Sequence, residues 1–183
     1  MNKAELVDNS SDPLTRRARA LLLSTLEFAL ASVDPHRLVT QHVKLVTQNA
    51  KKRGGRLLVD GQPTSLTRYE RIFVVGAGKA SGAMAETLER ILGSRLEGGL
   101  VAVPAAESVL RPTHVTLVEA SHPTPDENSV KAAKKIMALV ESLSDRDLLI
   151  CVISGGGSAL LSLPIDALTL EDKGTAARAI MNA

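Results

Sequence analysis

The sequence is poor in aromatic residues and in cysteine. Its 183 residues include two Phe, one Tyr and no Trp. A core must therefore be built from Leu, Val, Ile and Ala, as in sheets covered by helices on both faces. The single cysteine, Cys151, has no partner for an internal disulfide, which favours a reducing compartment, and we expect a cytoplasmic protein. Because Cys151 lies in an apolar run, we expect it to be a small buried hydrophobic residue.

Excess charge and long apolar runs are also missing. A formal net charge of +2 provides no basic footprint for nucleic acid. The basic segment 16–19 precedes an apolar run, as in a signal peptide, but Glu27 interrupts that run. Leucine and alanine recur every four residues from Leu14 to Leu30, which predicts an amphipathic helix over 13–33. No run is long enough to cross a membrane, so we expect neither nucleic acid nor a membrane as partner.

The chain changes character near residue 71. Residues 1–12 are polar, and we expect them to be loose. After the helix at 13–33 we expect a second, less regular helix at 35–49. A turn at 51–55 and a short hairpin arm from Arg56 should follow. Strands are then predicted at 71–76, 100–103, 115–118 and 147–153. They alternate with helices at 80–93, at 127–143 and from about Thr169, where Thr169 and Asp172 resemble a capping box. This alternation predicts an α/β fold, a Rossmann-like three-layer domain with a mostly parallel sheet. The sequence stops inside the last helical pattern, so we expect this domain to be incomplete at its C-terminus.

The first apolar strand leads into a glycine loop, Gly76-Ala77-Gly78-Lys79. It is not a Walker A loop, because Phe73 stands where the first glycine is required. The dinucleotide fingerprint also fails, since Ser81 replaces its third glycine. What remains is a strand, a tight turn and Lys79 at the start of a helix, where the helix dipole favours an anion. In the alternative interpretation, the glycines only allow close packing and Lys79 faces solvent.

The strand at 147–153 leads into a second glycine loop, Ser154-Gly155-Gly156-Gly157-Ser158. Three consecutive glycines carry a large conformational entropy cost, so a plain connector would rarely use them. Their backbone N–H groups and the two serine hydroxyls could bind an anion. The spacing of a nucleophile elbow, G-x-S-x-G, is absent. A loop without a ligand is the alternative.

A third segment, 121–129, holds two prolines that predict a turn at a strand end. His122 and Asp126 are candidate substrate or acid–base groups. Asp126 could equally cap the helix that follows. The other three histidines show no metal-ligand spacing, and we expect no protein metal site.

Taken together, four segments occur in the order found in the glycerate 2-kinases: 74–81, 121–126, 153–161 and 168–173. The chain therefore resembles this family, the class II glycerate kinases, from about residue 14 to its end. Some members of the family are labelled hydroxypyruvate reductase. Ser121 departs from the family pattern, in which a glycine is common at this position.

The resemblance implies phosphorylation of D-glycerate to 2-phosphoglycerate, with ATP and Mg²⁺ as cofactors and only small molecules, glycerate and a nucleotide, as partners. Family members have two domains, so residues 13–183 would be the N-terminal Rossmann-like domain and the second domain would be absent. A homo-oligomer is compatible with the sequence. Lys79 matches a family lysine that contacts the transferred phosphate and is the catalytic candidate. The residues expected to bind substrate or phosphate are Gly76, Gly78, Ser154, Gly155, Gly156, Gly157 and Ser158, with His122 and Asp126 beside them.

Two alternatives remain open. One is an NAD(P)H-dependent hydroxypyruvate reductase, which a Rossmann-like pattern supports and the incomplete fingerprint opposes. The other is a non-catalytic domain that binds a phosphorylated metabolite. Under all three interpretations, the kinase included, this chain could be inactive by itself, because much of the expected active-site cleft is absent.

Overall fold

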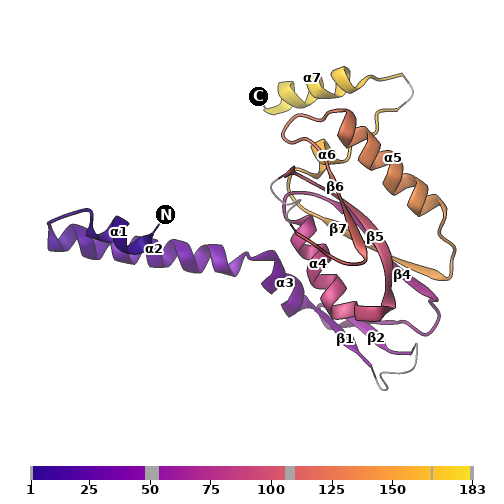
Figure 1. Cartoon of the computed structure of the whole chain (residues 1–183), viewed down its shortest axis with the longest axis horizontal. Coiled ribbons are helices and arrows are strands. Elements are labelled where there is room, and N and C mark those ends of the chain that lie inside the picture. The colour runs from indigo at the N-terminus through magenta and orange to yellow at the C-terminus, as the bar shows by residue number, and fades with distance from the viewer. Residues whose placement is uncertain (1, 48–53, 106–109, 166, 182–183) are drawn as a thin grey trace. The chain divides into compact units, whose positions relative to one another are not determined.

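The computed structural model describes residues 2–47, 54–105, 110–165 and 167–181 (Figure 1). The chain forms two compact units, Met1–Leu38 and Val39–Ala183. The helix predicted at 13–33 is confirmed as α2 (Pro13–Ser32), and the Asp12 carboxylate caps it by accepting from the N–H groups of its first turn. The segment expected to be loose contains α1 (Lys3–Asp8), whose N-terminus is capped by the side chain of Asn2. Among the residues described, no helix is long and apolar enough to span a membrane.

A small antiparallel sheet opens the second unit. Its order is β1-β2-β3, formed by β1 (Val43–Val46), β2 (Arg56–Val59) and β3 (Gln62–Ser65). The hairpin arm is confirmed, but the helix predicted at 35–49 is wrong from residue 43 onward. Helix α3 spans Pro35–His42, and β1 begins at the next residue. Burial in β1 alternates with a period of two, with Val43 and Leu45 half-buried, and Leu45 pairs with Leu57 of β2. The basic part of the predicted turn, 51–53, lies outside the described residues.

The main sheet has four strands, β4 (Arg71–Ala77), β5 (Leu96–Val103), β6 (Val115–Glu119) and β7 (Asp147–Ile153), all parallel. The helices that follow these strands are α4 (Ser81–Leu92) with the 3₁₀ turn η1 (Gly93–Arg95), α5 (Glu127–Glu141), α6 (Gly157–Leu160) and α7 (Leu170–Met181). The predicted α/β fold with a parallel sheet is therefore confirmed (Figure 1).

Helices pack on both faces of this sheet. Leu88 of α4 packs with Val74 on one face, where residues of the small sheet join the same core cluster. Ile136 of α5 and Leu160 of α6 pack with Val75 on the other face. Val74 and Val75 are neighbours in β4 and point to opposite faces, so both sides of a central strand must be apolar. Aliphatic side chains and alanine fill both layers, as the scarcity of aromatic residues predicts.

The strand order places the two glycine loops side by side. In space the order is β6-β5-β4-β7, so in chain order the third, second, first and fourth parallel strands are neighbours. This is the doubly wound order, in which the connections diverge between the first and fourth strands and leave a crevice at their carboxyl ends. Ala77 at the end of β4 pairs with Ile153 at the end of β7. Both glycine loops therefore leave the sheet at the same level, beside this crevice.

The prediction that Cys151 is buried is wrong. Cys151 is exposed. Ile153, two residues further along β7 and therefore on the same face of the sheet, has 72% of its surface exposed. Within the described part of the chain, β7 pairs only with β4, so β7 is an edge strand. An apolar strand pattern cannot reveal whether both of its edges and faces are covered.

Candidate functional site

The two glycine loops are hydrogen-bonded to each other. The Lys79 N–H donates to the Gly155 carbonyl over 2.9 Å, and the Ser154 N–H donates to the Ala77 carbonyl over 3.2 Å. The Ala80 N–H donates to Ser154 Oγ over 2.9 Å. The Ser154 hydroxyl, expected to bind an anion, therefore ties the first loop to the second.

Gly76 and Gly78 are required by close backbone contacts. A Cβ atom on Gly76 would lie 2.0 Å from the Val152 carbonyl oxygen. Gly78 has φ +142°, and a Cβ atom there would lie 2.1 Å from Ser154 Oγ. These contacts support the packing interpretation of both glycines, and a contact with phosphate stays a prediction.

Three predicted residues from separate segments meet at Gly156. Gly156 has φ +89°, and a Cβ atom on it would lie 2.6 Å from His122 Cδ2 and 3.5 Å from Lys79 Cγ. His122 comes from the turn after β6, and Lys79 from the loop after β4. The topology thus brings a lysine, a histidine and a glycine loop together at the carboxyl edge of the sheet, which no sequence spacing shows.

Several hydrogen-bond donors at this edge remain available. Among the residues that the structure describes, none accepts from the N–H groups of Gly155 or Gly156, or from the Lys79 ammonium. Consecutive backbone N–H groups in such a loop form a concave anion site, and a nearby ammonium strengthens it. The arrangement is suited to binding phosphate or carboxylate oxygens.

Asp126 caps α5. Its carboxylate accepts from Ser121 Oγ over 2.8 Å and from the Ser129 N–H over 3.0 Å, and Ser129 Oγ accepts in return from the Asp126 N–H. Partial burial raises the pKa of Asp126, but the hydrogen bonds from Ser121 and Ser129 outweigh it, so its pKa lies below the ordinary value. The carboxylate stays ionised and holds the turn that carries His122.

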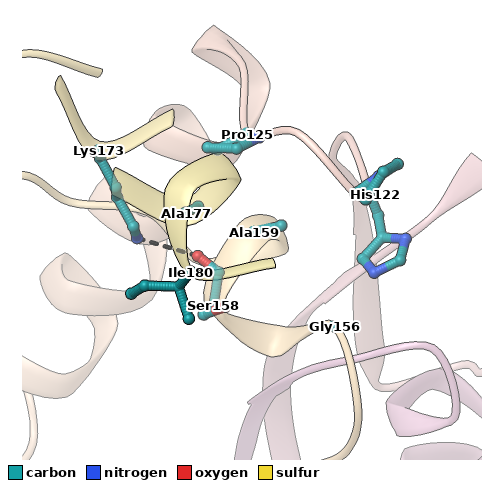
Figure 2. A pocket seen from close by; sticks show the side chains of 9 residues that line it. His122, Pro125, Gly156, Ser158, Ala159, Lys173, Ala177 and Ile180 are labelled. Atoms are coloured by element: carbon teal, nitrogen blue, oxygen red, sulfur yellow. Dashed lines mark hydrogen bonds between the residues drawn. The ribbon is translucent and has the colours of Figure 1, made fainter. Parts of the chain in front are cut away.

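A cavity of about 290 Å³ lies beside the second glycine loop. It joins the turn after β6 to helices α6 and α7, and most of its wall is apolar (Figure 2). Its size falls at the lower end of the range for small-molecule sites. The lining residues are His122, Pro123, Pro125, Gly156, Ser158, Ala159, Lys173, Ala177 and Ile180.

Lys173 in this wall is a polar group that sequence reasoning missed. Figure 2 shows its side chain reaching toward Ser158, and Nζ lies 2.9 Å from the Ser158 carbonyl oxygen. Burial lowers the pKa of the Lys173 ammonium. The capping box predicted before it is confirmed, because the Asp172 N–H donates to Thr169 Oγ1 and the Asp172 carboxylate accepts from the Thr169 N–H. A lysine in the first turns of a helix is unfavourable because its charge opposes the helix dipole. This unfavourable position is the feature of the sequence that could have marked Lys173 as a residue with a further role.

The described residues contain no group of three or more His, Cys, Asp and Glu side chains that could hold a metal ion. Mg²⁺ in nucleotide sites is bound by one or two carboxylates together with substrate phosphates. The donors described here are suited to the phosphates.

Comparison with known proteins identifies relatives over nearly the whole chain. The model of a family described as "Domain of unknown function (DUF4147)" matches residues 21–183. A putative hydroxypyruvate reductase of Agrobacterium vitis is 36% identical over 170 residues, which cover 90% of this chain and 32% of the relative. A glycerate kinase of Danio rerio is 35% identical over 173 residues, with coverages of 87% and 32%. A glycerate 2-kinase of Pyrococcus horikoshii is 33% identical over 144 residues, with coverages of 79% and 30%.

Solved structures agree. A crystal structure of a Pyrococcus horikoshii protein matches with a TM-score of 0.73 and 28% identity, covering 90% of this chain and 35% of that one. The crystal structure of glycerate kinase from Thermotoga maritima matches with a TM-score of 0.66 and 26% identity, with coverages of 88% and 34%. These matches confirm the similarity to the glycerate 2-kinase family. The chain spans about a third of the length of these relatives.

Proposed function

The chain belongs to the DUF4147 family, and we propose that it forms the phosphate-binding part of an enzyme that transfers a phosphoryl group from ATP to D-glycerate, giving 2-phosphoglycerate. The observation that carries this proposal is the meeting of Lys79, His122 and Gly156 at the carboxyl ends of β4 and β7. Relatives named glycerate kinase and glycerate 2-kinase support the choice of substrate.

Positioning and charge neutralisation account for most of the catalysis of phosphoryl transfer. In the proposed mechanism the Lys79 ammonium binds an oxygen of the transferred phosphoryl group and stabilises its charge in the transition state. The N–H groups of Gly155 and Gly156, with the Ser158 hydroxyl, bind neighbouring phosphate oxygens. His122, which lies against Gly156, donates a hydrogen bond to the acceptor substrate, while Asp126 holds the turn on which His122 sits.

Mg²⁺ would neutralise phosphate charge in such a reaction. Gly76, Gly78 and Ser154 contribute in this proposal by holding the two loops together at the phosphate.

The wider organisation is proposed on the same basis. We propose that residues 13–183 form the N-terminal, Rossmann-like domain of a longer enzyme, since the chain spans about a third of the length of its relatives. Turnover is therefore expected from the complete gene product and not from this chain alone. The single cysteine favours a cytoplasmic location, and small molecules, not nucleic acids, are the proposed partners.

A hydroxypyruvate reductase is the second candidate. The Agrobacterium vitis relative carries that name, and the doubly wound strand order is common to dinucleotide-binding domains. Ser81 opposes this candidate: it occupies the third glycine position of the fingerprint, is fully buried, and its hydroxyl lies 3.3 Å from Ser154 Oγ. The serine fills the space that a dinucleotide fold keeps for close helix–strand packing.

The test uses the complete gene product with D-glycerate and Mg-ATP and, separately, with hydroxypyruvate and NADH. We expect ADP and 2-phosphoglycerate in equal amounts. Lys79→Ala should lower kcat by about 100-fold or more, as the loss of one transition-state donor does. Its melting temperature should not change, because the Lys79 side chain is exposed.

The matched control is Lys134→Ala, which removes an exposed lysine from α5 and should leave kcat unchanged. Full activity of the Lys79→Ala enzyme would contradict the proposed role of this lysine. Oxidation of NADH by hydroxypyruvate, without ADP release from ATP, would establish the reductase instead.

A further inference from the structure

Lys173 clamps the end of the second glycine loop. Its Nζ donates to the Ser158 carbonyl over 2.9 Å and to Ser162 Oγ over 2.8 Å. Ser162 is fully buried, and its hydroxyl in turn donates to the Ser158 carbonyl over 3.0 Å. Within the described part of the chain, no backbone N–H donates to this carbonyl. Lys173 and Ser162 therefore supply the hydrogen bonds that a longer helix would have provided.

The clamped carbonyl is close to the predicted phosphate donors. Ser158 lies two residues after Gly156, which precedes α6 and contacts His122. The Ser154 N–H donates to the Ala77 carbonyl of the first loop over 3.2 Å, so the second loop is held at its start by the first loop and at its end by Lys173. Between these two holding points lie the N–H groups of Gly155 and Gly156.

No carboxylate of the described residues pairs with the charge on Lys173. Among the residues described, no Asp or Glu oxygen lies within 4.0 Å of its Nζ, although Lys173 is half-buried in the wall of the 290 Å³ cavity. Burying an unpaired ammonium is costly, and burial accordingly lowers the pKa of Lys173 from its ordinary value. An ammonium also has three donors, and the described residues provide two acceptors for them. An anionic ligand in the adjoining cavity would compensate both the charge and the third donor.

From this geometry we propose that Lys173 is a positioning residue for phosphate binding: it fixes the Ser158 carbonyl, so that the Gly155 and Gly156 N–H groups are held ready for a phosphate, and it makes the cavity wall favourable for an anion. This inference rests on the proposed function, in which the same loop binds the phosphates of ATP. A purely structural lysine would instead only attach α7 to α6, and its loss would lower stability without a selective effect on ligand affinity.

The experiment compares four variants of the complete gene product with the unmodified enzyme: Lys173→Met, Lys173→Arg, Ser162→Ala and the control Lys134→Met. Lys134 is exposed on α5, so its replacement removes one charge without touching the loop. Steady-state kinetics with Mg-ATP and D-glycerate provide KM and kcat, calorimetric titration with inorganic phosphate provides anion affinity, and thermal unfolding provides stability.

We expect Lys173→Met to raise the KM for ATP and the Kd for phosphate by about 10- to 100-fold, the loss expected for a hydrogen bond to a charged group. Lys173→Arg should restore most of this affinity because it keeps the charge and the donors. Ser162→Ala should have a smaller effect in the same direction, and Lys134→Met none.

Unchanged KM and phosphate affinity in Lys173→Met would overturn the inference, as would equal losses of stability in Lys173→Met and Lys173→Arg with no difference in affinity between them. The proposed function fails separately. If the unmodified enzyme does not phosphorylate D-glycerate but binds phosphate, and Lys173→Met weakens that binding, Lys173 keeps its role in anion binding and the kinase is wrong. If it neither turns over nor binds phosphate, both are wrong.

Discussion

Replacing Gly76 by alanine tests why glycine stands at the end of β4. A Cβ atom at this position would lie 2.0 Å from the Val152 carbonyl oxygen and 2.5 Å from Val152 Cγ2, whereas ordinary contacts begin at 3.4 Å. The backbone of β7 would have to retreat by about 1.4 Å at the last pair but one of the β4–β7 ladder. A backbone oxygen in a hydrogen-bonded ladder cannot move that far without loss of the neighbouring bonds.

The expected cost follows from two contributions. Overpacking of a tight interior costs about 1–3 kcal/mol. Each ladder hydrogen bond that is stretched or lost costs about 0.5–1.5 kcal/mol. Gly76→Ala should therefore lower the free energy of unfolding by about 3 kcal/mol or more, which for a chain of this size corresponds to about 6–12 °C in melting temperature.

Urea-induced unfolding, followed by far-ultraviolet circular dichroism, measures this change. Gly98→Ala in β5 is the matched control, since the nearest atom to its Cβ would be the His114 carbonyl oxygen at an ordinary 3.6 Å. It should change stability by less than about 1 kcal/mol, toward greater stability, because alanine restricts the unfolded chain. Gly99→Ala, whose Cβ would lie 2.2 Å from the Val74 carbonyl oxygen, should behave like Gly76→Ala.

One outcome would refute the reasoning. If Gly76→Ala and Gly98→Ala unfolded at the same urea concentration as the unmodified chain, β4 and β7 could not be as close as described. If Gly76→Ala also lost affinity for phosphate while remaining fully stable, the glycine would serve the ligand and not the packing.

Three further predictions concern the turn, the sheet edge and the loop. Asp126→Ala should destabilise the protein by about 1–2 kcal/mol in thermal unfolding and Asp126→Asn by much less, because both acid and amide cap a helix; equal losses would contradict the capping role. Two hydrogen bonds from Arg71, each 2.7 Å long, hold the pKa of Asp147 well below its ordinary value, so this pair stabilises the fold fully above about pH 5 and less as the pH falls. Asp147→Asn should therefore flatten the decrease in melting temperature between about pH 5 and 2, and an unchanged slope would count against it. Gly156→Ala should lower the free energy of unfolding by about 1–2 kcal/mol because of the positive φ at this position, and it should also displace His122. Its affinity for phosphate should therefore fall below that of Asp126→Ala, which has a similar expected loss of stability. Titration of both variants with phosphate measures this difference, and equal affinities would contradict the prediction.

Local patterns predicted most of the second unit correctly. The apolar runs at 71–76 and 147–153 became β4 and β7, and the periodicity at 127–143 became α5. Long, strongly periodic segments are predictable because one face must be buried whatever the neighbour is. The segment at 43–46 was missed because four residues carry too little periodicity to distinguish a strand from a continuing helix, and pairing with β2 decided the outcome.

Predictions about the site divided in a similar way. Lys79, His122 and the second glycine loop were proposed from their residue types at strand ends; the fold brings them together, and their roles stay predictions. Lys173 was missed because its contacts with Ser158 and Ser162 span 15 and 11 residues and involve a different helix. No short spacing encodes such a contact.

The sequence by itself determined the class of the fold, the approximate positions of the four parallel strands and the identity of the two glycine loops, because these depend on local periodicity and on the special backbone freedom of glycine. Tertiary structure alone decided the strand order β6-β5-β4-β7, the edge position that exposes Cys151, and the use of the Ser154 hydroxyl to join the loops. These features depend on which segments meet across long chain separations, and the free energy of that choice lies in packing and hydrogen bonds between distant residues.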